Sequence, residues 1–265
     1  MVRKTNPIFH AFGTLFQTFK EAKKYPQTFL FLMMHGMASS GVGSIITQLP
    51  TYAVAQLESS GFQISVLVVA ILVFAIPSAL SYSYCCAPRF SPKSIQIGTI
   101  IWFIIFTAYF ALVVNKPGSF PLAVIGAIMA GIGFGLWYSL NLAHFMKMIP
   151  HDKKAEFVGL YSFCGYLPRF LPPIVYNVVV ESINDHITAF LTLLIWFGLG
   201  LIICFCIDFE KGERDANAGA ILENANDPTQ GKNNKASSSS SSSSSAGESK
   251  DLQLNLCARG GILSY

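Results

Sequence analysis

Charged residues are scarce in this chain, and their scarcity excludes most soluble folds. Of its 265 residues, 12% are Asp, Glu, Lys or Arg, whereas 52% are hydrophobic. A soluble globular domain carries about 25% charged residues. The net charge of +4 does not indicate nucleic-acid binding, because the lysines lie in loops between long apolar runs. The composition instead indicates a protein that crosses the lipid bilayer several times.

Signatures of metal sites and of catalysis are also missing. The six cysteines show no CxxC spacing, so we expect no zinc or disulfide framework, no metal and no cofactor. Neither the HExxH motif of zinc proteases nor the GxSxG motif of serine hydrolases occurs. Serine, histidine and acidic residues are present, but no spacing couples them. We therefore expect no enzymatic activity.

What the chain does contain is six long apolar runs. A helix needs about 20 such residues to cross the hydrocarbon core. The runs lie at about 27–54, 63–84, 95–114, 120–145, within 149–181, and at 187–207. We therefore predict an all-α polytopic membrane protein with a six-helix transmembrane domain over 27–208. A basic amphipathic segment (1–26) precedes the domain, and a serine-rich tail (209–265), too polar to fold alone, follows it as a disordered region.

The distribution of lysine and arginine predicts the orientation. The loops 85–94 and 146–154 are basic, as is segment 1–26, whereas the loops 55–62, 115–119 and 181–186 hold a single lysine. Cytoplasmic loops of membrane proteins are enriched in basic residues. Both termini are therefore predicted to be cytosolic.

The fifth apolar run, Ile149–Glu181, is unusual because it holds Pro168, Arg169, Pro172 and Pro173 near its middle. An arginine at mid-membrane costs about 2.5–3.5 kcal/mol on insertion scales, so it normally faces a cavity or a partner. Each proline removes an amide donor, which predicts a kinked or broken helix that acts as a gate. No carboxylate lies inside the predicted spans, so backbone carbonyls, an anionic ligand or another chain must pair with Arg169.

Other polar residues concentrate in the first and fourth runs. Together with Arg169, the residues expected to contact substrate are His35, Ser40, Gln48, Tyr138 and Asn141. For His35, a packed interior role is the alternative. The pair Gly131-x-x-x-Gly135 allows close helix packing, with a role in gating motion as the alternative. The third and sixth runs are nearly uniformly apolar and are expected to face lipid.

The stretch IPHDKKAEFVGLYSFCGYLPRFLPP resembles the autophagy-related vacuolar effluxer family of the major facilitator superfamily. The matching residues are Ile149, Pro150, Lys153, Lys154, Ala155, Glu156, Phe157, Gly159, Leu160, Tyr161, Phe170, Leu171 and Pro173. Val73–Leu80 is similar to the eighth helix of the family. Ser40 stands where family members tend to have the acidic residue of a DGV motif, which argues against proton coupling through that position.

The resemblance covers about residues 25–208 and implies that these spans form the second half of a twelve-span transporter. It implies alternating-access transport of small organic solutes, amino acids among them, from a vacuole-like compartment to the cytosol. The membrane would be vacuolar or lysosome-like, with the plasma membrane as the alternative. A missing N-terminal half or a second copy would complete the pathway. The alternative function is that of a non-transporting membrane protein that binds or regulates a partner.

Overall fold

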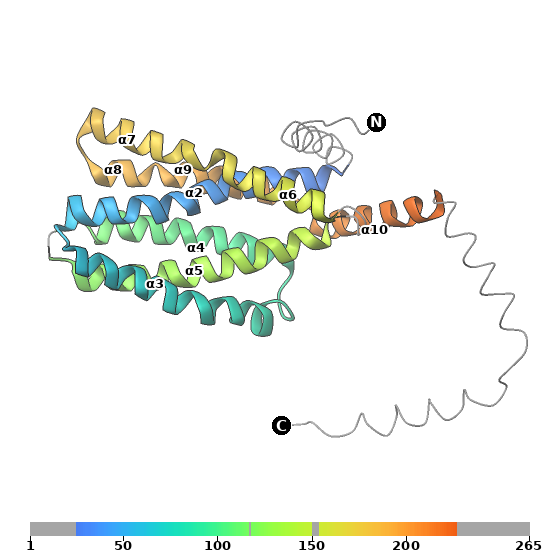
Figure 1. The fold of residues 1–265 in the computed structure, drawn as a ribbon, viewed down its shortest axis with the longest axis horizontal. Helices are drawn as coiled ribbons and strands as arrows, with labels where there is room; N and C mark the ends of the chain where they lie inside the picture. Colours follow the sequence, from blue (N-terminus) through green and yellow to red (C-terminus); the bar gives the residue numbers. More distant parts are fainter. Residues whose placement is uncertain (1–24, 117, 150–153, 227–265) are drawn as a thin grey trace, which may run out of the picture. The chain divides into compact units, whose positions relative to one another are not determined.

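The computed structural model describes residues 25–116, 118–149 and 154–226, without the side chains of 85, 86 and 219–226. Every regular element in these ranges is a helix, which confirms the predicted all-α class (Figure 1). Five helical segments here are long and apolar enough to cross a membrane. They are α2 (Pro26–Leu57), α3 (Gly61–Ser81), α4 (Pro92–Val113), α5 (Phe120–Lys147), and α8 (His186–Leu191) with α9 (Leu193–Cys206). The helices belong to the compact unit that ends at Ala220.

The predicted fifth span is broken in the middle, as its prolines indicate. It consists of α6 (Lys154–Tyr166), a 3-10 turn η3 (Leu167–Phe170) and α7 (Leu171–Ile183). Each of the two α-helices has 13 residues, too few to cross a bilayer alone. A stretch of 3-10 helix inside a longer helix often marks a hinge. The break therefore places Arg169, within η3, between the two α-helices.

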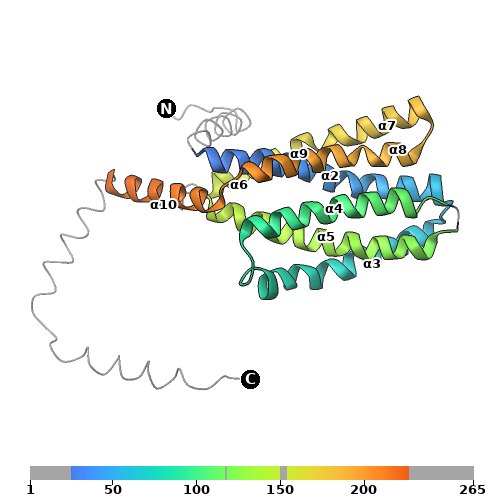
Figure 2. The ribbon, with the colours of Figure 1, turned by 180° about the vertical axis from the view of Figure 1, so that it is seen from behind.

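Helix α2 forms the centre of the bundle. Figures 1 and 2 place it between α7–α9 on one side and α3–α5 on the other, and 72% of its apolar window is buried. On α4, the ring of Phe103 stacks on Phe197 of α9 at 5.5 Å, and Phe110 packs at 5.6 Å from Phe190 of α8.

The prediction that the third and sixth spans face lipid is therefore wrong for part of their surface, and 33% of the apolar window of α8 and α9 is buried. The apolar window of α4 is 44% buried, against 11% for α3, which is the least covered of the long helices in the described residues. Phenylalanine packs as readily against helices as against lipid. Apolarity alone therefore cannot distinguish the two environments.

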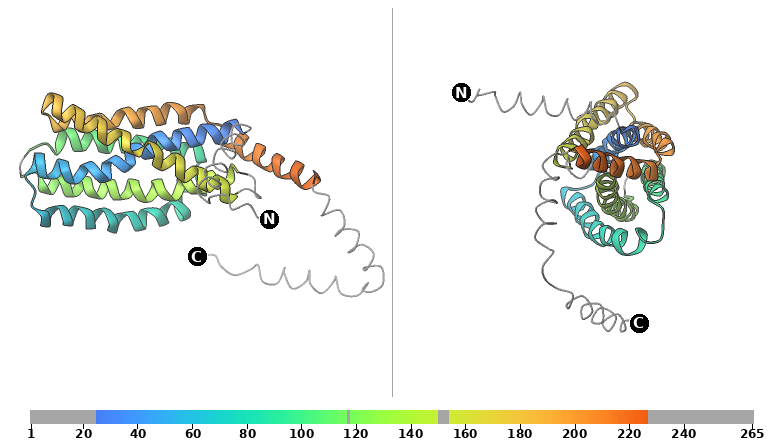
Figure 3. Two further views of the ribbon diagram at one scale, coloured as in Figure 1. Left: turned by 45° about the horizontal axis from the view of Figure 1, so that its top comes forward. Right: turned by 90° about the vertical axis from the view of Figure 1, so that its right-hand side faces the viewer.

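The loops that the sequence predicts to share one side of the membrane lie at one end of the bundle. Hydrogen bonds there join Gln27 to Asp208, Thr28 to Met148, Tyr82 to His144, and Lys93 to Phe205. These residues lie near the start of α2, the ends of α3, α5 and α9, and the start of α4. The left view in Figure 3 shows the helices running alongside one another between the two ends, and the right view looks along the bundle. That this end is cytosolic remains a prediction.

Helix α10 (Phe209–Asn226) corrects the prediction that the tail is disordered from residue 209. Phe209, Gly212 and Ala216 are buried on one face of α10. The ring of Phe209 lies 5.9 Å from that of Phe31 in an edge-on contact. A few small and apolar residues at helical spacing are enough for a helix to pack against a bundle. The prediction missed them because it considered only the polar composition of the whole segment. Segments 1–24 and 227–265 lie outside the described residues.

Asp185 supports the start of α8 and gives a first prediction. Its carboxylate accepts hydrogen bonds from the amides of Ile187 (3.0 Å) and Thr188 (3.1 Å). The hydrogen bond from the Thr188 hydroxyl has the largest effect, and together with those from the two amides it holds the pKa of Asp185 below its usual value. Replacing Asp185 by alanine should lower the free energy of unfolding by about 1 kcal/mol at neutral pH, because the cap is lost.

This difference should depend on pH. A carboxylate with a lowered pKa in the folded state stabilises fully above its unfolded pKa of about 4, and the contribution fades as the pH falls through the folded value. Thermal unfolding in detergent at pH 7 and pH 3 should therefore show the two proteins converging in acid. An equal difference at both pH values would contradict the assigned role.

Candidate functional site

Arg169, on the 3-10 turn, lies across helix α2. A Cβ atom placed on Gly43 of α2 would lie 2.6 Å from Arg169 Cδ and 2.8 Å from Cγ, so the arginine stem occupies the space above this glycine. The guanidinium carbon stands 4.8 Å from the centre of the Tyr166 ring, in a cation–π contact. The break in the fifth span thus directs its cation toward the central helix.

The charge of Arg169 is not neutralised within the described residues. No carboxylate there forms an ion pair with it, and its buried Nε finds no hydrogen-bond acceptor. A guanidinium carries five N–H donors in a planar fork that matches a carboxylate. Because an unsatisfied buried donor costs free energy, this arrangement favours an anionic group beside Arg169.

His35 of α2 is packed and hydrogen-bonded in this conformation. This is the interior role that the sequence analysis gave as the alternative to substrate contact. Its ring stacks on Tyr161 of α6 at 4.0 Å between centroids. The Ser39 hydroxyl lies 3.2 Å from its Nδ1. A Cβ on Gly165 would lie 2.7 Å from its Nε2, so the chain of α6 passes directly beside the ring. His35 therefore helps to fix α6, immediately before the break, against α2.

Asn141 of α5 is engaged in a contact that the sequence did not predict. Its Oδ1 accepts a hydrogen bond from Gln96 Nε2 of α4 at 3.2 Å, and its Nδ2 donates to the carbonyl of Trp137 at 2.8 Å. Asn141 and Gln96 are both fully buried. This pair joins α4 to α5, so Asn141 has a structural role in this conformation. Gln96 could have been found in the sequence as a polar residue within an otherwise apolar run, which needs a hydrogen-bond partner inside the bundle.

Two further predicted contact residues are buried on α2. The Ser40 hydroxyl donates to the carbonyl of Gly36 at 2.7 Å, within its own helix. Gln48 is 5% exposed. Neither side chain lies at the surface in this conformation, so any contact with a solute would require the surrounding helices to separate.

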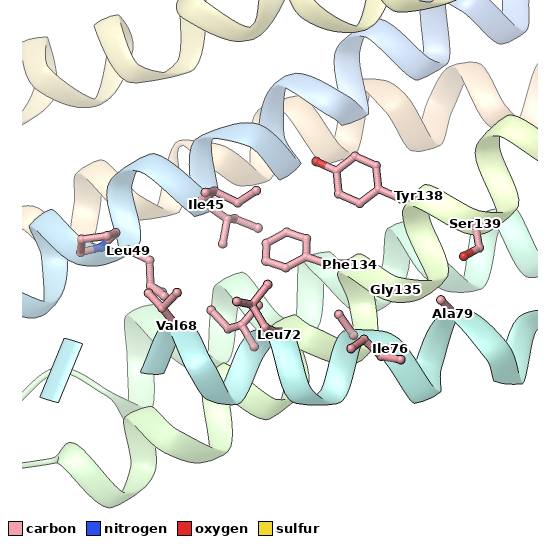
Figure 4. A pocket seen from close by; sticks show the side chains of 14 residues that line it. Ile45, Leu49, Val68, Leu72, Ile76, Ala79, Phe134, Gly135, Tyr138 and Ser139 are labelled. Carbon is pink, nitrogen blue, oxygen red and sulfur yellow. The ribbon is translucent and has the colours of Figure 1, made fainter. Parts of the chain in front are cut away.

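An apolar cleft of about 640 Å³ lies between α2, α3 and α5 (Figure 4). Its lining is mostly aliphatic and includes Ile45, Leu49, Val68, Leu72 and Ile76. Tyr138, which is 49% exposed, stands at the cleft with its hydroxyl directed toward α2 in Figure 4. Tyr138 therefore lies where a solute in the cleft would meet a polar group.

The glycines of α5 allow α3 to pack closely, as predicted. A Cβ on Gly131 would lie 2.5 Å from the carbonyl oxygen of Ile71, and one on Gly135 would overlap the carbonyl oxygen of Ala75. The Ser78 hydroxyl adds a hydrogen bond to Ile132 at 2.6 Å. A role of these glycines in motion remains a prediction.

The remaining predicted residues lie along the broken span. Pro172 is buried and Pro173 is half-buried, both in the first turn of α7, while Pro168 is half-buried in η3. Lys154 begins α6 and Glu156 lies in its first turn. Nothing lies within 4 Å of a Cβ placed on Gly159. Pro150 and Lys153 fall outside the described residues.

Comparison with known families decides the identity. The family model described as Vacuole effluxer Atg22 like matches residues 2–217. The chain belongs to this family. The resemblance carried by the stretch from Ile149 to Pro173 is thereby confirmed.

Several relatives of the vacuole effluxer family match at low identity. The Bacillus subtilis protein named Uncharacterized MFS-type transporter YxiO is 26% identical over 196 residues, which cover 74% of this chain and 44% of that protein. Autophagy-related protein 22 of Yarrowia lipolytica is 24% identical over 214 residues, 79% of this chain and 36% of that protein. The corresponding protein of Saccharomyces cerevisiae strain S288c is 22% identical, with coverage of 80% and 41%. The chain thus spans about two-fifths of the length of these relatives. No solved structure matches the chain significantly.

Proposed function

We propose that this chain is a secondary membrane transporter, or half of one. It would move small organic solutes, amino acids in particular, from a vacuole-like compartment to the cytosol by alternating access. The observation that carries the proposal is the break between α6 and α7, which directs onto α2 an arginine, Arg169, without an ion-pair partner among the described residues. The family description, an effluxer, supports transport rather than catalysis.

In this proposal Arg169 binds the carboxylate of the solute. Its guanidinium offers paired N–H donors, and charge-assisted bonds are roughly twice as strong as neutral ones. Arg169 does not line the aliphatic cleft, but the α2 side of the cleft starts at Ile45, two residues after Gly43, so the cleft would receive the rest of the molecule. Because burying an uncompensated charge in an apolar site is costly, this lining favours neutral amino acids over charged ones.

The same break supplies the hinge for alternating access. The 3-10 turn η3 separates α6, held to α2 by the stacking of His35 on Tyr161, from α7. Rotation at η3 would change the side of the membrane from which Arg169 is accessible. Helices α3 and α5, locked together at Gly131 and Gly135, would move as one body.

A second six-helix unit would complete the pathway, as either a preceding half or a second copy. The sparse burial of α3 and the exposed apolar residues of α7, including Ile174 and Val178, support this partner. Immunoblotting of native membranes with an antibody to the tail distinguishes the two forms. A band near twice the 28.9 kDa of this chain indicates a preceding half. A band near 28.9 kDa means that the chain must pair with a second copy to enclose a pathway, or else that it does not transport.

Solute flux tests the function directly. The protein is purified from its membrane in its native assembly, reconstituted into vesicles, and preloaded with an unlabelled neutral amino acid. We expect accumulation of the labelled amino acid by exchange, and none in vesicles without protein. Absence of exchange for every amino acid tested would instead favour the alternative, a membrane protein that binds or regulates a partner.

A further inference from the structure

We infer that Gly43 is a positioning residue: its lack of a side chain creates the slot on α2 in which Arg169 lies. This inference rests on the proposed function for its effect on transport. Its geometric part stands independently, on the contact between two residues 126 positions apart in the chain. Gly43 itself makes no contact with a solute in this proposal and acts through the arginine.

The atoms that crowd Gly43 are all in one side chain. A Cβ there would lie 2.8 Å from Arg169 Cγ, 2.6 Å from Cδ, and closer still to Nε. Real Cβ atoms essentially never approach another heavy atom below 3.0 Å. A methyl group at this position and the observed arginine conformation are therefore mutually exclusive.

Gly43 differs in this respect from the glycines that pack against backbone, such as Gly36 and Gly131. At Gly36 the nearest atom to an added Cβ is the Cys164 carbonyl oxygen, at 2.9 Å, and at Gly131 it is the Ile71 carbonyl oxygen. Those contacts are with backbone, so a larger residue would force helices apart. At Gly43 the obstacle is a flexible stem, which can rotate away while α2 and η3 keep their places. Substitution there should change the position of the guanidinium without unfolding the protein.

The slot has a chemical consequence for the cation. It places the arginine stem against α2, with Nε buried and the guanidinium carbon 4.8 Å from the Tyr166 ring. The guanidinium is thus fixed in one place before any ligand arrives, which reduces the entropy lost on binding. An arginine displaced from the slot keeps its charge but loses this preorganisation.

The first experiment measures the chemical accessibility of Arg169. The whole protein in detergent is treated with phenylglyoxal, which modifies guanidinium groups, and the modification of the peptide carrying Arg169 is followed by mass spectrometry. In Gly43→Ala protein we expect modification to be at least about fivefold faster, because a guanidinium displaced from the slot and from the Tyr166 ring offers its terminal nitrogens, the atoms that react, more freely to the reagent. The matched control is Gly198→Ala on α9, where an added Cβ has nothing within 4 Å. An unchanged rate in Gly43→Ala protein would overturn the inference.

The second experiment measures transport in the same proteins. Gly43→Ala should raise the KM for the amino acid about tenfold, the effect of losing one hydrogen bond to a charged group, and leave the maximal rate nearly unchanged. Combined with Arg169→Gln, Gly43→Ala should have no further effect on KM, since the group it positions is absent. A purely structural role would instead lower the maximal rate in both backgrounds, which would contradict positioning.

The two readouts separate the inference from the proposed function. If Arg169 is modified faster in Gly43→Ala protein but the protein without substitutions shows no amino-acid flux, the slot is upheld and the transport proposal is overturned. If the protein without substitutions transports amino acids but Arg169 is modified at the same rate in Gly43→Ala protein, transport is upheld and the role of Gly43 is overturned. Thermal unfolding is measured in parallel, and a midpoint for Gly43→Ala close to that of Gly198→Ala is expected.

Discussion

Arg169→Gln protein is expected to lose about 10- to 100-fold in apparent affinity for its amino-acid substrate while keeping its fold. The loss corresponds to one charge-assisted interaction, worth about 1.5–3 kcal/mol. Folding should not suffer, because the substitution removes a costly cation from the interior of a membrane span. The cation–π contact with Tyr166 disappears as well, at a partly exposed position where such contacts contribute about 0.5–1 kcal/mol. Uptake kinetics in vesicles and thermal unfolding in detergent measure the two effects.

The matched control is Arg214→Gln on α10. Arg214 pairs with Glu210 at 3.2 Å, and both side chains are largely exposed. Such surface pairs contribute little, so uptake and stability should remain at the level of the unmodified protein. If Arg169→Gln protein took up amino acids as well as this control, Arg169 would have no role in solute binding.

The second large effect is expected at Gly135, where a leucine should destabilise the bundle by about 3 kcal/mol or more. The contact is with backbone: an added Cβ would overlap the Ala75 carbonyl oxygen and lie 2.9 Å from the Ala79 amide nitrogen. Helix α3 cannot move aside locally without giving up its packing along α5. We expect a markedly lower unfolding temperature and a reduced yield of folded protein.

Gly198→Leu provides the comparison for this prediction, because the space around that glycine is open. Leucine should therefore be neutral there. Equal unfolding temperatures for the two variants would show that α3 and α5 do not pack as described. Together with Gly43→Ala, these variants separate glycines that hold helices together from one that holds a side chain.

The broken span and the all-α bundle could be predicted from the sequence because local chemistry dictates them. A backbone inside lipid must satisfy its own hydrogen bonds, so long apolar runs become helices. Single prolines, Pro50 and Pro77, leave α2 and α3 continuous, whereas the cluster Pro168, Pro172 and Pro173 coincides with the break, which is why the cluster was the useful signal. The close packing at Gly131 and Gly135 was also visible, since small residues four apart lie on one helix face.

The partners of individual side chains could not be predicted, because they depend on which helices become neighbours. Asn141 was expected to face substrate, and its bond to Gln96 appears only once α4 packs beside α5. Gly43 is one of several glycines in its run, and no local feature marks it as the residue that contacts Arg169. The role of Gly43 depends on its contact with Arg169, which belongs to a distant segment of the chain.

The most direct test of the carboxylate site is an equilibrium binding cycle on the purified protein. Binding of a neutral amino acid and of its amide, which lacks the carboxylate, is measured for unmodified and Arg169→Gln protein. We expect the unmodified protein to bind the amino acid at least about tenfold more tightly than the amide, and this preference to vanish in Arg169→Gln protein. A preference that persists without Arg169 would contradict the assignment of the break between α6 and α7 as the carboxylate site.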